Sequence, residues 1–523
     1  MTPSTEPGNQ TDGGEDSDAP NRPSRLLPLS PLSPLSPLST LSTLSRRQFV
    51  EGALKLGVAG FTATGAAGLL AACHSKKKAA APKKLTGRVQ ILIGFDGGNT
   101  AAQRQVQQTL AQAFIAAHPQ VGIDFLRATS ATAAETQLRT LVSRGSAPDI
   151  VLGIGQANLS RLADQHMWLD LRPLFRRDGV STNSFSSQAT SAAALSSYYG
   201  GTKAIPGVPV AVQNHALAYN VDLFSKAGLP APPASWSDNS WAYPASFLQA
   251  AQTLTVDQAG KHSGQAGFDP TQIVQFGVAR IPPEYLFFSF GGHFYNVSKK
   301  RAEFDTPAAI QGAQFAGDLL GKYHVQPSAA EFAKLAGPEN SGNEEQAAWR
   351  AGKLAMIDLC SCEIDSPFGT KVPFAWKAAA LPAGPGGRFG PLEVNAGAIV
   401  VAGTQHDLAW EVLKSFAVDP GHERQLAYGG FGAMPALTAN TDAFVAGTKQ
   451  VAGVDPAVWL AGLPNASTEA ATWIPAFADV HSLFKTAVDK IAGGASAATV
   501  MPQLQADAQA KIDAWFKVNK LPH

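Results

Sequence analysis

From Val89 onward, the order of hydrophobic and polar positions predicts strands and helices in alternation. Val89–Phe95 is a short, β-branched apolar run typical of a buried strand, and Asp96–Thr100 has the composition of a loop. A helix then ends at Pro119. Its inward-facing positions lie four residues apart: Val106, Leu110, Phe114 and His118.

Two further strand–helix units follow in the same order. They are a half-buried strand at Val121–Phe125, a helix at Ala131–Ser143, a strand at Pro148–Leu152 and a helix that carries Leu159 and Leu162. Strands that alternate with helices form parallel sheets with right-handed crossovers. We therefore predict an α/β protein with a parallel sheet in this region.

In such sheets, ligands bind beyond the carboxyl ends of the strands. This places the candidate loops at 96–100, 127–130 and 155–158. Their short polar side chains offer paired donors and acceptors to a ligand: Asp96, Asn99, Gln156 and Asn158. The alternative for each is a turn or helix-cap role, which favours the same residue types.

The N-terminal region has the pattern of an export signal rather than of a packed domain. A Pro-Leu-Ser unit repeats over Pro28–Ser39, and proline at every third position blocks both helix and sheet. Arg46 and Arg47 precede an uncharged stretch, an order that resembles a twin-arginine signal. The stretch ends in Leu70–Cys73, which resembles a lipobox. We expect Cys73 to become the lipidated first residue, although the uncharged stretch alternatively fits a transmembrane helix and Cys73 a chance cysteine.

Composition excludes some functions. A chain of 523 residues favours two lobes, and a net charge of +1 with mixed signs gives no basic patch for nucleic acid. There is no His-Glu-x-x-His helix, no Gly-x-Ser-x-Gly elbow and no phosphate-binding loop. The histidines are scattered without ligand spacing. We therefore expect no catalytic residue, no metal site and no cofactor.

A series of segments, each weak alone, has a specific order and spacing along the chain. They are Phe95–Thr100, Phe114–Pro119, Ala147–Leu152, Leu159–Leu162, Ala218–Phe224, Ser289–Gly292, Ala348–Met356, Ala409–Lys414 and Met434–Pro435. Together they resemble the family 1 extracellular solute-binding proteins, the maltose-binding-protein-like receptors of bacterial ABC importers. One departure is Cys360–Glu363, which stands where the family often places an aromatic residue. We expect Cys360 and Cys362 to be buried thiols, with a disulfide loop as the alternative.

The resemblance implies the two-lobed, type II periplasmic-binding-protein fold, with a mainly parallel sheet flanked by helices in each lobe, crossing hinge segments and a helical C-terminus. The expected organisation is as follows: 1–72, a disordered region and signal peptide; 73–85, a tether; 86–212 with 396–445, the first lobe; 213–395 with 446–523, the second lobe. The chain would cross between lobes near Val212 and Asn395.

A reversible sugar receptor needs planar hydrogen-bonding groups, aromatic faces and two lobes that close. Polar candidates beyond the first loops are Gln213, Asn214, Glu363 and Asn395. Aromatic candidates are Trp241, Tyr285, Phe431 and Trp473. Core packing is the alternative for each aromatic residue.

The resemblance implies a non-enzymatic, monomeric binding lipoprotein on the extracellular face of the cytoplasmic membrane. Its expected partners are a small polar ligand such as a sugar or oligosaccharide, a membrane permease and its own lipid anchor, with no nucleic acid. The mixed Asp, Asn, Gln and aromatic candidates favour a neutral polyol or sugar over a phosphate. The alternatives are an exported sensor or scaffold lipoprotein of the same fold, or an exported carbohydrate-active enzyme.

Overall fold

The computed structural model describes residues 84–163, 165–190, 204–296, 298–366, 368–370, 372–452, 454–467 and 474–519. The predicted export signal at Arg46 and Arg47, the predicted lipidation site Cys73 and the aromatic candidate Trp473 lie outside these ranges. In the described part of the chain, none of the helices combines the length and apolar composition that a membrane span requires.

Strands and helices alternate through most of the described chain. The strands are β1 (Gly87–Ile93), β2 (Val121–Arg127), β3 (Ile150–Gly155), β4 (Val208–Asn220), β5 (Val256–Asp257), β6 (Ile273–Gln275), β7 (His293–Asn296), β8 (Arg301–Glu303), β9 (Met356–Cys360), β10 (Trp376–Ala379), β11 (Ala383–Gly384), β12 (Gly387–Arg388), β13 (Gly390–Ile399), β14 (Met434–Pro435) and β15 (Ala466–Ser467). The α-helices are α2 (Ala101–Ala117), α3 (Ala131–Ser143), α4 (Gln156–Ala163), α5 (Arg172–Asp178), α6 (Ser187–Thr190), α8 (Val221–Lys226), α9 (Ala245–Leu254), α10 (Pro283–Ser289), α11 (Pro307–Gly321), α12 (Ala329–Ala336), α13 (Glu344–Arg350), α14 (His406–Ala417), α15 (Pro420–Arg424), α16 (Thr441–Ala452), α17 (Ala457–Gly462), α18 (Phe477–Ala492) and α19 (Ala497–Asn519). Short helical turns are η1 (Thr182–Ser184), η2 (Pro338–Asn340), η3 (Ser361–Glu363), η4 (Gln425–Phe431), η5 (Thr438–Asn440) and η6 (Leu463–Asn465).

The predicted parallel unit is confirmed. Strand β1 pairs in parallel with β2 on one side and with β3 on the other. Helix α2 begins with a capping box at Thr100, in which the Thr100 hydroxyl accepts from the Gln103 backbone N–H and the Gln103 side chain accepts from Thr100 N–H. Helix α3 spans the predicted residues, and β3 continues to Gly155, beyond its predicted end at Leu152.

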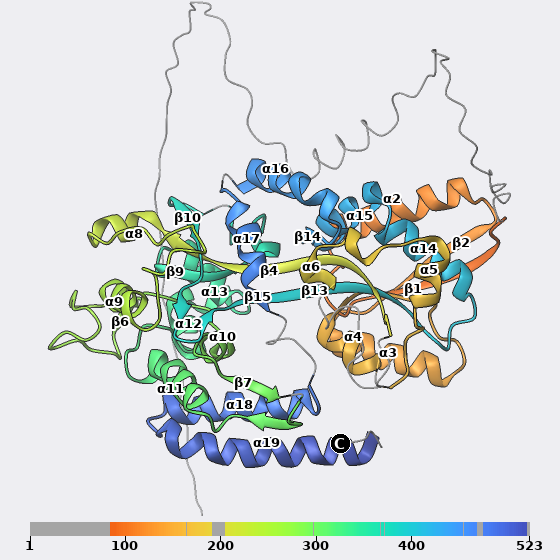
Figure 1. The fold of residues 1–523 in the computed structure, drawn as a ribbon. Helices are drawn as coiled ribbons and strands as arrows, with labels where there is room; N and C mark the ends of the chain where they lie inside the picture. The colour runs from red at the N-terminus through yellow and green to blue at the C-terminus, as the bar shows by residue number, and fades with distance from the viewer. Residues whose placement is uncertain are drawn as a thin grey trace, which may run out of the picture. The chain divides into compact units, whose positions relative to one another are not determined.

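Two long antiparallel strands connect the parallel unit to the rest of the sheet. The strand order is β10-β4-β13-β3-β1-β2, and Figure 1 shows β4 and β13 running side by side. The first half of β4 pairs with β13, while its second half pairs with β9 and β10. The predicted crossing points Val212 and Asn395 therefore lie in the middle of neighbouring strands rather than in loops.

Hydrophobic packing covers both faces of this sheet. Trp349, Trp410 and Trp459 are fully buried in one continuous cluster that also holds the apolar side chains of β1, β4 and β13. A second cluster joins α9, α10 and α11 to the C-terminal helices α18 and α19. The predicted helical C-terminus is confirmed. Gly321 of α11 contacts the backbone of Ala492 so closely that a Cβ atom would lie 1.8 Å from its carbonyl oxygen.

Candidate ligand-binding site

Polar side chains gather on one face of the sheet where β4 and β13 lie next to each other. Gln213 of β4 is directly opposite Glu393 of β13, and Asn395 is opposite Gly155 at the end of β3. Because side chains alternate along a strand, Glu393 and Asn395 point to the same face. Val394 between them is fully buried in the core on the other face.

Asp96 meets this face from the loop after β1. A methyl group placed on Gly155 would lie 3.4 Å from Oδ2 of Asp96 and 3.9 Å from Oδ1 of Asn395, so these two side chains converge beside Gly155. Burial and the nearby charge of Glu393 raise the pKa of Asp96 to about 6, against the opposing effect of the Asn395 amide.

Two buried amides, Gln156 at the start of α4 and Asn214 on β4, are only partly satisfied. Nε2 of Gln156 donates to the carbonyl of Leu392 at 2.9 Å, and Nδ2 of Asn214 donates to the carbonyl of Trp459 at 2.5 Å. Neither Oε1 of Gln156 nor Oδ1 of Asn214 has a hydrogen-bond partner among the described residues. An unsatisfied buried acceptor costs about 1–3 kcal/mol, and a bound donor would remove that cost.

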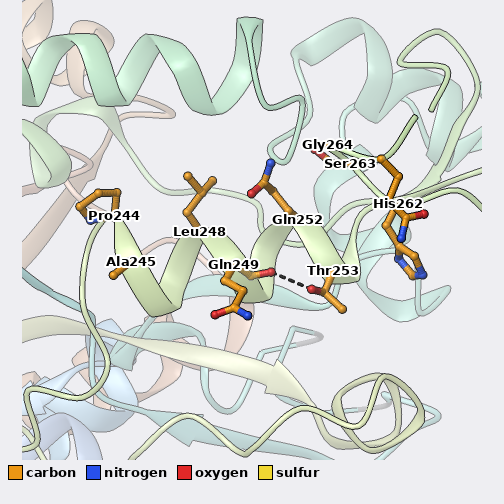
Figure 2. Close-up of a pocket in the computed structure, with 10 residues that line it drawn as sticks. Pro244, Ala245, Leu248, Gln249, Gln252, Thr253, His262, Ser263 and Gly264 are labelled. Carbon is orange, nitrogen blue, oxygen red and sulfur yellow. Dashed lines mark hydrogen bonds between the residues drawn. The ribbon is translucent and has the colours of Figure 1, made fainter. Parts of the chain in front are cut away.

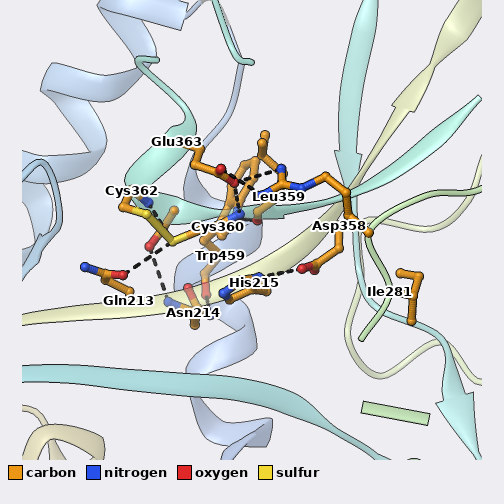
Figure 3. A network of polar contacts seen from close by, with 12 residues as sticks. Gln213, Asn214, His215, Ile281, Asp358, Leu359, Cys360, Cys362, Glu363 and Trp459 are labelled. Carbon is orange, nitrogen blue, oxygen red and sulfur yellow. Dashed lines mark hydrogen bonds and ion pairs between the residues drawn. A yellow bond between two sulfur atoms is a disulfide. The ribbon is translucent and has the colours of Figure 1, made fainter. Parts of the chain in front are cut away.

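A charged network borders the polar face on the β9 side (Figure 3). Nδ1 of His215 lies 2.7 Å from Oδ2 of Asp358. Burial lowers the pKa of His215, but the Asp358 carboxylate together with the nearby charges of Glu393 and Glu363 outweighs burial, and the pKa is raised. Arg280 donates to both carboxylate oxygens of Glu363 at 3.1 and 2.8 Å. Glu363, predicted to bind ligand, is therefore held in a two-point ion pair.

The expectation of two buried thiols is wrong, because Cys360 and Cys362 form a disulfide. It rested on treating both residues as part of one strand, where their Cα atoms would be ~6.6 Å apart. Strand β9 instead ends at Cys360 and the chain turns into η3, which brings the Cα atoms to 5.2 Å. The bridge lies beside Gln213 at the edge of the polar face (Figure 3).

Asn99 and Asn158, the remaining predicted polar residues, form hydrogen bonds within the protein. Nδ2 of Asn99 donates to the carbonyl of Ala128 at 2.7 Å, and Oδ1 of Asn158 accepts from Arg161 at 3.0 Å. Asn99 thus joins the loop after β1 to the loop after β2, and Asn158 is bonded within α4. These hydrogen bonds do not place either side chain beside Gln213 or Asn395.

The described aromatic candidates are buried among other apolar side chains. Trp241 lies edge-on to Phe247, and Phe431 packs against Gly98 and Gly153. Tyr285 is the one that borders the polar face, because its ring lies edge-on to His215 at 5.7 Å between ring centroids. Its burial raises its pKa well above the usual value.

Sequence reasoning missed Glu393, His215, Asp358 and Arg280. The spacing of Glu393 and Asn395 was a usable signal, because residues two apart on a strand share a face. The other three had no local signal. Among the described residues, no group of His, Cys, Asp and Glu side chains is arranged to hold a metal ion.

Two surface pockets lie elsewhere. Figure 2 shows one of about 460 Å³ between α9 and residues 262–265. Another of about 570 Å³ lies beside the β11–β12 hairpin. No predicted ligand-binding residue lines either pocket, so the polar face at the crossing strands is the candidate site.

This fold and this site define the class of the protein. The family model for the bacterial extracellular solute-binding proteins matches residues 97–422, and the chain belongs to this family. A protein of Brucella abortus described only as a binding protein is 24% identical over 316 residues, which cover 60% of this chain and 68% of that one.

Solved structures share the two-lobed fold. UspC of M. tuberculosis matches with a TM-score of 0.61 and 24% identity, covering 81% of this chain and all (100%) of that one. MalE of Bdellovibrio bacteriovorus, solved with maltotriose, matches with a TM-score of 0.58 and 16% identity over 82% of this chain and 100% of MalE. An ABC substrate-binding protein of Listeria monocytogenes, solved with cycloalternan, matches with a TM-score of 0.62 and 15% identity over 82% of this chain and 99% of that one. The α/β, two-lobed solute-binding fold expected from the sequence is thus confirmed.

Proposed function

We propose that this protein captures a sugar or a similar polyhydroxylated solute between its lobes and delivers it to an ABC permease, without a chemical step. The observation that carries the proposal is the polar face of β4 and β13, where Asp96 and Asn395 converge beside Gly155 and Gln213 lies opposite Glu393. Amide and carboxylate groups of this kind match vicinal hydroxyls, and buried acceptors without donors gain hydrogen bonds when a solute arrives. The solved relatives that carry maltotriose and cycloalternan support a carbohydrate ligand.

The test is a thermal-shift and tryptophan-fluorescence screen of the purified protein against mono- and oligosaccharides, polyols and sugar phosphates. A ligand that binds only the folded state increases the free energy of unfolding by RT ln(1 + [L]/Kd), so the melting temperature rises with ligand concentration. We expect a sugar to do so and to be recovered chemically intact. If the sugar is chemically converted, the protein is an enzyme rather than a receptor. If no compound of the panel raises the melting temperature, the sugar assignment is wrong.

The same proposal includes export through Arg46 and Arg47 and lipid anchoring at Cys73. Cys73→Ala removes the cysteine that would carry the thioether-linked lipid, so the protein is expected to move from the membrane fraction to the soluble fraction. The measurement is fractionation of cells with immunodetection. Ser75→Ala, which leaves the cysteine in place, is the matched control and is expected to stay membrane-bound. Equal membrane retention of the Cys73 variant would contradict the anchor.

Solute affinity is expected to fall as the pH drops from about 7.5 to about 5. The pKa of Asp96 is raised to about 6, so its carboxylate accepts hydrogen bonds above that pH and is progressively protonated below it. Titration calorimetry across this range measures the change. Asp96→Asn cannot titrate and is expected to flatten the profile. An unchanged profile in that variant would show that another group controls the pH dependence.

A further inference from the structure

The polar face carries carboxylates that the chain does not neutralise. Asp358 is paired with His215, and Glu363 is paired with Arg280. Asp96 and Glu393 form no ion pair with any cation of the described chain. Arg127, a cation of the same loop group, directs Nη1 to the carbonyl of Gly98 and to Oδ1 of Asn99 instead. Asp96, beside Gly155, and Glu393, opposite Gln213, are therefore two carboxylates of this face without an ion pair in the described chain, although Glu393 is near enough to His215 to help raise the pKa of that imidazole.

Neutral acceptors complete this acidic surface. Asn395 is 1% exposed and Gln156 is 2% exposed. Oε1 of Gln156 and both Oδ1 and Nδ2 of Asn395 have no hydrogen-bond partner among the described residues. The Asn395 oxygen lies beside Asp96, because both approach the same point at Gly155. The Gln156 amide nitrogen is used on Leu392, which leaves its oxygen as the free end. The unpartnered donors are Nδ2 of Asn395 and, in the neighbouring loop group, Nη2 of Arg127. Acceptors outnumber them on this face once the carboxylate oxygens of Asp96 and Glu393 are included.

This excess of hydrogen-bond acceptors, two of them carboxylates, indicates which chemical group of a solute would bind here. A sugar hydroxyl donates one hydrogen and also needs a donor for its own lone pairs. A protonated amine donates three hydrogens, accepts none and carries the compensating charge. A divalent cation such as calcium requires six to eight oxygen ligands around one point, and no group of three or more His, Cys, Asp and Glu side chains among the described residues is arranged to hold a metal ion. The ammonium group fits the arrangement best.

We propose that the solute captured by this protein carries a protonated amine, as an amino sugar does, and that the amine binds between Asp96, Glu393 and Asn395. This inference rests on the proposed function as a sugar receptor. It differs from the neutral sugar or polyol that the residue types alone favoured. Glu393 is assigned as a specificity-determining residue, since it contributes the second negative charge.

Matched pairs of sugars test the proposal on the full-length protein. Glucosamine, galactosamine and the glucosamine disaccharide are each titrated at about pH 7 beside their N-acetylated forms and the corresponding neutral sugars, with calcium chloride as a further probe. An amine is expected to bind at least ~10-fold more tightly than its neutral counterparts. Glu393→Gln is expected to reduce that ratio several-fold, while Glu411→Gln, on α14 and paired with Lys414, is expected to keep it.

The outcomes separate the two proposals. If neutral sugars bind as tightly as their amine counterparts, the amine proposal is wrong and the sugar-receptor proposal remains. The same holds if the Glu393 variant keeps both the wild-type melting temperature and the wild-type ratio of amine to neutral-sugar affinity. If calcium binds the protein and the amines do not, the amine proposal is also wrong. If neither amines nor neutral sugars bind the wild-type protein, the proposed function itself fails.

Discussion

Replacing Asn395 with leucine is expected to reduce solute affinity by about 100-fold, or ~2.7 kcal/mol, while the protein stays folded. Asn395 is 1% exposed, and its Oδ1 has no donor in the described part of the chain. Its polarity therefore contributes little to the stability of the unliganded protein, whereas a bound solute depends on it. Leucine has a similar size, and we expect the melting temperature without solute to be unchanged or slightly higher. Titration calorimetry and thermal unfolding measure the two effects.

Asn440→Leu provides the matched control for this prediction. Asn440 is also buried, but its Nδ2 donates to the carbonyl of Pro420 at 2.7 Å and to the Glu423 carboxylate at 2.6 Å. The leucine variant is expected to lose about 1–3 kcal/mol of stability, because the buried Glu423 carboxylate loses a donor, and to bind solute normally. If the Asn395 variant bound solute with wild-type affinity, the crossing strands would not be the site.

Gly153→Ala is expected to destabilise the protein by about 3 kcal/mol. Gly153 has φ +74°, a region where a Cβ atom costs roughly 1–2 kcal/mol. The added Cβ would also lie 2.2 Å from the ring of Phe431, which packs directly on this glycine, and overpacking of this kind costs roughly 1–3 kcal/mol. Chemical denaturation measures the loss, which appears as a lower midpoint with an unchanged slope.

Gly145→Ala separates the two causes of that loss. Gly145 has φ +68°, close to the value at Gly153, but nothing lies within 4 Å of an added Cβ atom. This variant is expected to lose only the backbone cost of about 1–2 kcal/mol. Equal losses in the two variants would mean that Phe431 moves away without cost and that its packing against β3 is loose.

The boundaries of several elements could be predicted from the sequence because their signals are local. Helix α3 spans the predicted residues, and Pro119 correctly marks the end of α2. Hydrophobic periodicity depends on which face of an element is buried, and that is recorded within a few turns of chain. The order of the segments also identified the family.

The same local reasoning could not assign roles to all of its candidates. Asn99 and Asn158 were candidates because they follow strands; Asn99 donates to Ala128 in another of the predicted ligand loops, and Asn158 accepts from Arg161 within its own helix. Short polar side chains at such positions serve turns and caps as readily as ligands, and their identity does not distinguish the two roles. The cysteine pair was misjudged for a related reason, because the end of β9 at Cys360 carries no strong signal in the sequence.

By itself, the sequence determined the alternation of strands and helices, the family and the candidates Asp96, Gln156, Gln213 and Asn395. Only the tertiary structure decided that β13 pairs with β4 and β3, which places Glu393 opposite Gln213 and Asn395 opposite Gly155. Pairing between strands far apart in the chain depends on the packing of the whole sheet, and a shift of one residue would turn every side chain to the other face. The charge of the site is therefore a property of the strand register rather than of any single segment.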